Sequence, residues 1–543
     1  MSLTHANVAP ALLELRGLTI GLPQQSDRPD AVSSLDLTVQ RGEIVCLVGE
    51  SGSGKSSIAL AIMGLLPTGL RLRNGQILLD GQDLVPLPAT ALRAVRAQRM
   101  AMIFQEPMSA LNPVMRCGAQ LDEVLREHTL LDLAARSKKM HAILHEVGFT
   151  DTEQIIAAYP HQLSGGQRQR IMIAMALVLE PALLIADEPT TALDVTTQAQ
   201  ILQLIASLQQ RRGMGVLFIT HDFGIVAEIA HRVLVLHAGQ CVESGTRTAV
   251  LQQPQQAYTQ QLIRAVPTLI ARASRVDPNA EVVLRVQDLS KTYDAPGWFS
   301  RRKATQALHQ IGLEIRRGQT LGIVGESGSG KSTLARCVAR LIEPTQGNIF
   351  LGGDDIAHRA ATSLRPLRRR VQIVFQDPYR SLNPRMTVGE ALIEGPLNYG
   401  VSRNEALQNA ARLLTLVQLE PAVMSRYPHQ FSGGQRQRLC IARALALAPD
   451  LLIADEAVSA LDVSVQAQVL ALLEDIRAKL QLAMLFITHD LRVAAQLCHH
   501  VTVMSHGEIV EHGPATEIFS HPQHPYTQTL LAAAPGRHFA FAQ

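Results

Sequence analysis

One glycine-rich octapeptide, GESGSGKS, occurs twice in this chain, at residues 49–56 and again at 325–332. Three later motifs recur in the same order: SGGQRQR (164–170 and 432–438), IADE (185–188 and 453–456) and FITHD (218–222 and 486–490). The two copies lie about half of the chain apart, a period far longer than the repeat of a solenoid protein. An ordered repeat of this length predicts a duplicated domain.

The length of the chain also fits two domains. A chain of 543 residues is too long for one hydrophobic core and allows each half to bury its own. Residues 266–281 contain no convincing helix or strand and are followed by the strand-like run VVLRVQDLSKTY. We therefore expect a first domain over 1–265, a linker over 266–281 and a second domain over 282–543.

The hydrophobic pattern predicts an α/β fold in each half. The run IVCLV at 44–48 leads directly into the first glycine-rich loop, and a segment with helical periodicity follows the loop. Other short, continuously apolar runs are typical of strands in a parallel sheet that is covered on both faces. Further strands are expected at 183–187, 216–220, 451–455 and 484–488, and Leu- and Ala-rich helical insertions at 114–162 and 385–430.

Composition excludes several classes of protein. Hydrophobic residues make up 47% of the chain, but the longest clear apolar run, at 171–179, is about half of a bilayer span. The N-terminus lacks the basic and apolar stretches of a secretory signal, so we expect a soluble, intracellular protein. The net charge is +3 with both signs interspersed, which argues against nucleic acid as a partner. Basic clusters at 301–303 and 368–370 are interpreted as solvated surface.

The six cysteines are far apart in the sequence and show no C-x-x-C or Cys/His spacing. We therefore expect no zinc site, no iron–sulfur cluster and no disulfide framework. Cys46 and Cys440 are interpreted as small buried hydrophobic residues.

The octapeptide has the pattern G-x-x-x-x-G-K-[ST], in which glycines let backbone N–H groups converge on phosphate oxygens at the positive end of a helix. The lysines, Lys55 and Lys331, are expected to reach the β- and γ-phosphates, and Ser56 and Ser332 to hold Mg²⁺. A single match could be a glycine-rich loop without a ligand, but two matches, each between strand and helix, favour phosphate binding. The predicted ATP-binding residues of the two loops are Gly49, Glu50, Ser51, Gly52, Ser53, Gly54, Lys55, Ser56 and Ser57, and Gly325, Glu326, Ser327, Gly328, Ser329, Gly330, Lys331, Ser332 and Thr333.

Each IADE motif ends a predicted strand with two carboxylates. Asp187 and Asp455 are expected to support the Mg²⁺ site, and Glu188 and Glu456 to orient the attacking water as general bases. A carboxylate after a buried strand is otherwise often an exposed turn. Its recurrence at a matched distance from the phosphate loop favours the catalytic interpretation.

The order of these motifs, together with Gln105 and Gln376 and with His221 and His489, resembles the ATP-binding-cassette (ABC) ATPases over essentially the whole chain. The resemblance implies two P-loop NTPase cassettes, each with a mostly parallel sheet core, an antiparallel β subdomain and a helical subdomain. It adds the two histidines to the catalytic set and the two glutamines to the Mg²⁺ ligands. It further implies ATP and Mg²⁺ as cofactors and an intramolecular cassette dimer.

In that family the SGGQ motif of one cassette closes the ATP site of the other. Both SGGQ motifs precede a long helical run, whose N-terminus suits an anion. The resemblance therefore pairs the loop of Lys55 with the second SGGQ, and the loop of Lys331 with the first. The motif residues are Ser164, Gly165, Gly166 and Gln167 in the first copy and Ser432, Gly433, Gly434 and Gln435 in the second.

Further motifs resemble the dipeptide/oligopeptide importers, including the fused ATPases of the glutathione and microcin C importers. These are FQEPMSALNPVM (104–115), FQDPYRSLNPRM (375–386) and the tail HPQHPYTQTLLAAAP (521–535). The resemblance implies an energy-coupling ATPase at the cytoplasmic face of the inner membrane, with two permease subunits and a solute-binding protein as partners. The transported solute stays open among dipeptides or oligopeptides, glutathione, a peptide antibiotic and a metal chelate.

The chain departs from the family pattern at one position. Tyr293, expected to stack on adenine, is replaced by Leu22 in the first copy. Pro and Asn in segments 106–113 and 377–384 predict loops. The resemblance implies that these loops lie beside the groove that receives a permease helix.

Two other classes of protein share the hydrolysis motifs. A soluble tandem ATPase acting on ribosomes or DNA usually carries long charged helices or zinc modules between its cassettes, and the linker here is short. A catalytically inactive regulator is disfavoured because both glutamates and both histidines are present.

Overall fold

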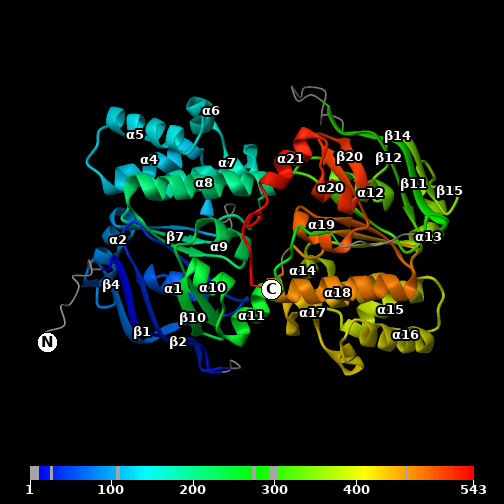
Figure 1. Ribbon diagram of the computed structural model, residues 1–543, viewed down its shortest axis with the longest axis horizontal. Helices are drawn as coiled ribbons and strands as arrows, with labels where there is room; N and C mark the ends of the chain where they lie inside the picture. The colour runs from blue at the N-terminus through cyan, green and yellow to red at the C-terminus, as the bar shows by residue number, and fades with distance from the viewer. Residues whose placement is uncertain are drawn as a thin grey trace. The chain divides into compact units, whose positions relative to one another are not determined.

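The computed structural model describes residues 11–24, 28–105, 110–191, 193–271, 277–293, 304–459 and 461–542, and they form two compact units (Figure 1). The first unit extends to Val266 and also contains the residues from His538 onward; the second covers Pro267–Arg537. The expected boundaries differ in two respects. Most of the expected linker belongs to the second unit, and the last residues of the chain belong to the first.

Each unit contains a six-stranded sheet whose central strands are parallel. In the first unit β3 (Ile44–Val48) lies between β8 and β9, and the strand order is β10-β9-β3-β8-β7-β6. The second unit has the order β20-β19-β13-β18-β17-β16. The other strands are β6 (Met100–Ile103), β7 (Leu183–Asp187), β8 (Gly215–Ile219), β9 (Arg232–His237), β10 (Gln240–Thr246), β13 (Thr320–Val324), β16 (Val371–Val374), β17 (Leu451–Asp455), β18 (Ala483–Ile487), β19 (His500–Ser505) and β20 (Glu508–Pro514).

Strands β8 and β18 begin and end one residue earlier than expected. The chain leaves the first of them at Thr220, whose Oγ1 accepts a hydrogen bond from the amide of Asp222 at 3.1 Å. The same bond joins Asp490 to Thr488 at 3.0 Å in the second unit. A local turn of this kind ends a strand without changing the hydrophobic pattern that predicts it.

A second, antiparallel sheet covers one side of each core. The strand orders are β2-β1-β4-β5 and β12-β11-β14-β15. The core of the first unit gathers residues of β1, β3, β7 and helix α1 (Lys55–Ile62) between the two sheets. The strands are β1 (Leu13–Gly21), β2 (Asp30–Val39), β4 (Arg71–Leu79), β5 (Gln82–Asp83), β11 (Val282–Tyr293), β12 (Thr305–Arg316), β14 (Gln346–Leu351) and β15 (Asp354–Asp355).

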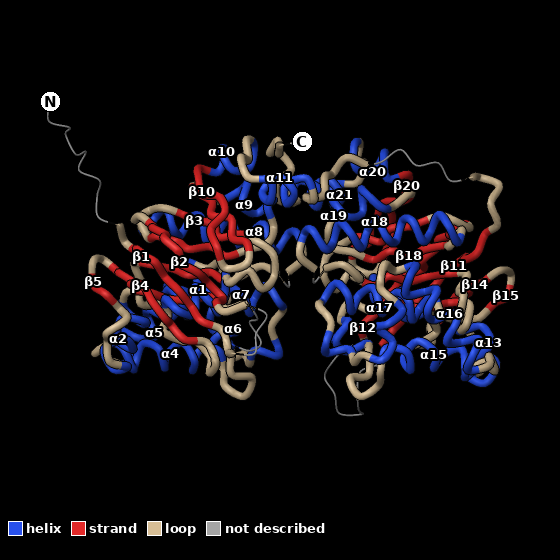
Figure 2. Tube along the Cα trace, turned by 90° about the horizontal axis from the view of Figure 1, so that it is seen from below, coloured by secondary structure: helices blue, strands red, loops and turns tan. Residues whose placement is uncertain are grey.

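Helices account for the rest of each unit and lie beside the strands in Figure 2. The expected helical insertions are present in both units. The helices of the first unit are α2 (Ala89–Gln98), α4 (Cys117–His128), α5 (Leu133–Glu146), α6 (Thr152–Ala157), α7 (Gly165–Leu177), α8 (Val195–Arg212), α9 (Phe223–Ile229), α10 (Arg247–Gln252) and α11 (Ala257–Arg264). Those of the second are α12 (Lys331–Val338), α13 (Ala361–Arg368), α14 (Pro378–Ser381), α15 (Val388–Asn398), α16 (Arg403–Leu416), α17 (Gly433–Leu445), α18 (Val463–Leu480), α19 (Leu491–Leu497), α20 (Ala515–Ser520) and α21 (Pro525–Ala532).

The expectation of a loop over 377–384 is wrong. Its first part is the single-turn helix α14, because Asp377 accepts hydrogen bonds from the amides of Tyr379 and Arg380 and Pro378 occupies the first helical position. In the corresponding segment 106–113, residues 106–109 lie outside the described part of the chain. The basic cluster at 301–303, expected to be solvated surface, also lies outside it.

The last described residues pack on the first unit. The amide of Ala542 donates to the carbonyl of Leu251 at 3.0 Å, and the guanidinium of Arg247 lies 5.9 Å from the ring centre of Phe539. Both contacts hold the end of the chain against α10.

Five of the six cysteines are buried and Cys241 is exposed. Burial raises the pKa of Cys440 to about 11, so this thiol stays neutral, as expected of a small hydrophobic residue. No helix among the described residues has both the length and the apolar character needed to cross a bilayer.

Candidate functional site

The glycine-rich loops join the central strand to a core helix in both units. Gly54 precedes α1 with a φ of 105°, and Gly330 precedes α12 with a φ of 102°, a region that favours glycine. At Gly49 and Gly325, with φ of 149° and 147°, a Cβ atom would overlap a backbone carbonyl of the neighbouring strand. The sequence therefore places glycine where the backbone needs it to form a concave loop.

The lysine of each loop folds back beneath it. The ammonium of Lys55 donates to the carbonyls of Gly49 at 2.7 Å and Glu50 at 2.8 Å. Lys331 donates to Gly325 at 2.8 Å and Glu326 at 2.6 Å. Each side chain is 6% exposed, so loop carbonyls hold a buried positive charge inside the concave loop.

Each loop serine meets the aspartate at the end of β7 or β17, the second strand along the sheet from the strand that precedes the loop. Ser56 donates to Asp187 at 3.2 Å, and Ser332 to Asp455 at 3.4 Å. Burial raises the pKa of Asp187 to about 6, and it also raises the pKa of Asp455. A hydroxyl and a carboxylate at this spacing are the oxygen ligands that Mg²⁺ prefers.

A glutamine, a glutamate and a histidine converge beside each aspartate. Gln105 Nε2 donates to Glu188 at 2.9 Å, and His221 Nδ1 lies 3.0 Å from the same carboxylate. In the second unit the amide of Gln376 and the ring of His489 lie 2.9 Å and 3.4 Å from Glu456.

The glutamates also have unusual backbones and lowered pKa values. Glu188 and Glu456 have φ of 47° and 50°, a strained conformation that tends to occur at functional sites. Burial alone would raise the pKa of each carboxyl, but the histidine hydrogen bond and charge outweigh it, so each pKa lies below its usual value. Although burial opposes it, the Glu456 contact raises the pKa of His489. Both glutamates are therefore carboxylates at neutral pH.

The SGGQ motifs start α7 and α17. Ser164 Oγ accepts from the amide of Gln167 at 3.2 Å, and Gln167 Oε1 accepts from the amide of Ser164 at 2.9 Å, which forms a capping box. Ser432 and Gln435 form the same box at 3.3 and 3.1 Å. A Cβ at Gly166 or at Gly434 would crowd the neighbouring helix, so glycine lets the two helices pack closely.

Tyr293 and Leu22 occupy different environments. Tyr293 ends β11, is 40% exposed, and its hydroxyl lies 3.5 Å from Oγ1 of Thr333 in α12, the helix that follows the glycine-rich loop. Leu22 follows β1 and packs, partly buried, against the core of the first unit. Only the second unit therefore presents an aromatic ring at this position.

Among the side chains that contact these sites and that sequence reasoning missed are Thr191 and Tyr526. Thr191 donates to the carboxylate of Glu188 at 3.0 Å, and the hydroxyl of Tyr526 accepts from the amide of Glu326 at 3.0 Å. Thr191 could have been found by looking for a hydroxyl donor in the turn that follows Glu188. The contact of Tyr526 joins residues 200 positions apart and has no local signal.

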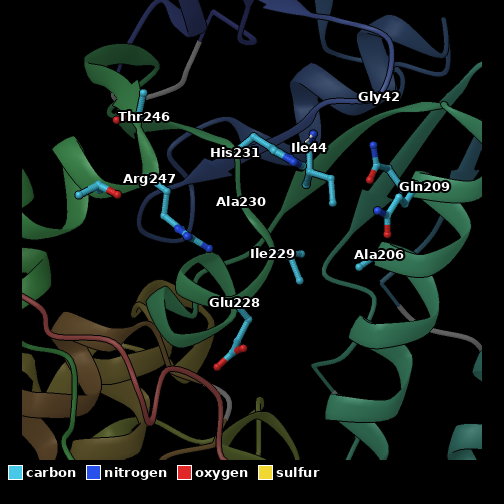
Figure 3. A pocket seen from close by; sticks show the side chains of 12 residues that line it. Gly42, Ile44, Ala206, Gln209, Glu228, Ile229, Ala230, His231, Thr246 and Arg247 are labelled. Carbon is cyan, nitrogen blue, oxygen red and sulfur yellow. Dashed lines mark hydrogen bonds between the residues drawn. The ribbon is translucent and has the colours of Figure 1, made fainter.

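A polar hollow of about 650 Å³ lies elsewhere on the first unit, between α8, α9 and α10 (Figure 3). Figure 3 shows the side chains of Gln209 and Arg247 on opposite sides of it. No residue of the phosphate loop, the strand-end carboxylates or the SGGQ motif lines this hollow. It is separate from the groups described above.

Comparison with known proteins settles the family. Residues 32–191 and 308–459 match the family model described as ABC transporter. The chain belongs to the ABC transporter family. Residues 242–293 and 510–539 match the C-terminal region of oligopeptide/dipeptide transporters, so this ABC protein carries that region in both halves.

The chain is similar over nearly its whole length to known transport ATP-binding proteins. It is 48% identical to the peptidoglycan transport ATP-binding protein YejF of Agrobacterium fabrum, covering 98% of this chain and 97% of that protein. It is 46% identical to the glutathione import ATP-binding protein GsiA of Salmonella choleraesuis, covering 96% and 89%. Among solved structures, the ADP- and phosphate-bound cassette MJ0796 is 28% identical over 43% of this chain and 98% of that chain, with a TM-score of 0.39.

The expected fold class and enzyme class are confirmed. The chain has two ABC cassettes, each with a mostly parallel sheet, an antiparallel sheet and a helical region. ABC cassettes bind ATP, and the chain is an ABC ATPase.

Proposed function

We propose that this ABC ATPase is the energy-coupling subunit of an importer for peptides or peptide-like solutes, of the dipeptide/oligopeptide, glutathione or microcin C type. The observation that carries the proposal is the oligopeptide-type C-terminal region, which follows the ATPase core in both halves. The names of the relatives YejF and GsiA support it, since both are ATP-binding proteins of transport systems. The partners would be two permease subunits and a solute-binding protein, and the chain would lie at the cytoplasmic face of the inner membrane.

We also propose specific roles for the clustered side chains. The loops of Lys55 and Lys331 bind the ATP phosphates. In each site a hydroxyl, an amide oxygen and a carboxylate oxygen fit Mg²⁺, which when bound would neutralise phosphate charge. The proposed Mg²⁺ residues are Ser56, Gln105 and Asp187 in one site and Ser332, Gln376 and Asp455 in the other.

Glu188 and Glu456 orient the attacking water. Their lowered pKa keeps them ready to accept a hydrogen bond from it, and the neighbouring His221 and His489 hold the carboxylates in place. Each site is completed by the SGGQ motif of the other cassette, with Ser432 serving the loop of Lys55 and Ser164 serving that of Lys331.

A contact at the surface of the second cassette supports a docking role for α14. Tyr379 is 66% exposed, and the guanidinium of Arg436 lies 3.8 Å from the centre of its ring. Arg436 belongs to α17, the helix that begins after Ser432. A permease segment bound at α14 would therefore press on the helix that presents the SGGQ motif.

Photo-cross-linking in membranes tests this proposal. A photoreactive residue in place of Tyr379 is expected to capture an integral membrane polypeptide, identified by mass spectrometry of the adduct. The same residue in place of Leu480, which is 49% exposed at the end of α18, serves as the control and should capture none. Capture solely between the two halves of the chain would count against docking at α14. The corresponding probe site in the first half, Met108, lies outside the described residues.

The two sites are expected to bind nucleotide unequally. Stacking of an aromatic ring on a base is worth ~1–3 kcal/mol, which corresponds to roughly 5- to 150-fold in affinity at about 1.4 kcal/mol per decade. The site with Leu22 should be weaker than the site with Tyr293. Titration with a fluorescent nucleotide should show tighter binding for Leu22→Tyr and weaker binding for Tyr293→Leu. Equal wild-type affinities that neither substitution changes would contradict this prediction.

A further inference from the structure

The oligopeptide-type tail of the second cassette contacts the phosphate loop. The hydroxyl of Tyr526, in α21, accepts a hydrogen bond of 3.0 Å from the backbone amide of Glu326. The carbonyl of Glu326 accepts the 2.6 Å bond from the ammonium of Lys331. The same loop residue therefore connects the tail tyrosine to the phosphate-binding lysine.

The tail sequence HPQHPY builds a turn that fixes the position of Tyr526. Glu511 in β20 accepts hydrogen bonds from the amides of Gln523 at 2.8 Å and His524 at 3.2 Å. The ring of His524 accepts from the amide of Tyr526 at 3.2 Å, and Pro525 occupies the first position of α21. The histidine, the proline and the tyrosine of this motif thus act as one structural unit.

Electrostatics stabilise this turn. Partial burial by itself would raise the pKa of Glu511, but the amide hydrogen bonds of the turn outweigh it and hold the pKa below its usual value. The carboxylate is therefore charged at neutral pH, and charged acceptors make the stronger hydrogen bonds.

We propose that Tyr526 is a positioning residue for ATP binding, and that the tail of the second cassette acts through it on the phosphate loop. The hydroxyl holds the backbone of Glu326 in place. The carbonyl of Glu326 in turn sets the position of the Lys331 ammonium, which would bind the phosphates. This role rests on the proposed function of the Lys331 loop as an ATP site. The tail, which follows the ATPase core in the sequence, would thereby take part in ATP binding.

The substitution Tyr526→Phe removes the hydroxyl and keeps the ring. A net hydrogen bond contributes about 0.5–1.5 kcal/mol, so we expect the ATP dissociation constant of the second site to rise about 2- to 12-fold. The KM for ATP should rise with it, while kcat at saturating ATP stays unchanged. Binding is measured with trinitrophenyl-ATP in the full chain carrying Lys55→Ala, so that the second site alone reports.

The matched control is Tyr399→Phe, which removes a tyrosine hydroxyl bond of 2.6 Å to the carbonyl of Arg365, in the same cassette. This variant should keep the parent affinity. Glu511→Ala, which loosens the turn without touching the tyrosine, should weaken ATP binding in the same direction as Tyr526→Phe.

The outcomes separate the two hypotheses. If the Lys55→Ala parent does not bind the nucleotide at all, the proposed ATP site is wrong. If the parent binds and both Tyr526→Phe and Glu511→Ala keep its affinity, the role of the tail is overturned. An equal loss of affinity in Tyr399→Phe would also overturn it, because the effect would then be a general one on the stability of the cassette.

Discussion

The double substitution Glu188→Gln and Glu456→Gln is expected to reduce ATP hydrolysis by ~10²–10⁴-fold, the usual contribution of a positioned general base. ATP binding should persist, because the phosphate loops and their lysines are untouched. Glutamine keeps the size of the side chain and its ability to accept a hydrogen bond, but it lacks the negative charge that the histidine contact stabilises. Phosphate release and nucleotide binding are measured on the same preparation.

Gln105 and Gln376 approach the two carboxylates in the same way, at 2.9 Å in both units. The control is Glu314→Gln, which neutralises an exposed carboxylate paired with Arg285 on the antiparallel sheet and should leave hydrolysis unchanged. Turnover of the double variant near the wild-type rate would show that other groups act on the water. A loss of ATP binding together with hydrolysis would instead show that the glutamates serve in nucleotide binding.

Ser432→Arg is expected to reduce hydrolysis at the site of Lys55 by roughly 10²-fold, comparable to removal of an oriented donor at a reacting centre. A long cationic side chain at the start of α17 should keep the SGGQ motif from completing that site. Ser164→Arg should do the same to the site of Lys331. The pairing can be tested because the two phosphate loops can be disabled one at a time.

In a double-mutant cycle, Ser432→Arg should add little to Lys55→Ala, since both disable one site. Combined with Lys331→Ala, it should abolish the remaining hydrolysis. The control is Ser402→Arg, which removes the serine cap of α16, a bond of 3.3 Å from the amide of Glu405, without touching the SGGQ motif. If Ser432→Arg instead adds little to Lys331→Ala and abolishes the hydrolysis that remains in Lys55→Ala, each SGGQ motif serves its own cassette.

The sequence predicted the parts of the site that depend on neighbouring residues. The loop between β3 and α1 is set by glycines that permit positive φ, and Asp187 is the last residue of β7, a strand whose every residue is buried. Both features leave a local pattern in the chain. The motifs of the two halves recur in the same order, and this pattern, which is also visible in the sequence alone, indicated two domains of one fold.

Of the features that the sequence analysis missed, one depends on a distant contact and two depend on local geometry that has no periodic pattern. Nothing near Tyr526 indicates that its hydroxyl reaches Glu326, since strand pairing and the turn at Glu511 bring them together. Helix α14 was missed because a single turn is set by the cap of Asp377 and has no periodicity. The contact of Thr191 with Glu188 lies within one turn, three residues after the glutamate, where no periodic pattern marks it.

The packing of Phe539 and Ala542 on α10 has a consequence for biosynthesis. Residues up to Val266 leave the ribosome first, but the segment that completes their unit begins only at His538. At about 5–20 residues per second, the intervening second unit takes on the order of 15–50 s to translate. During that interval the surface of α10 is without its final neighbour, and the first cassette reaches its finished form only after its twin has been synthesised.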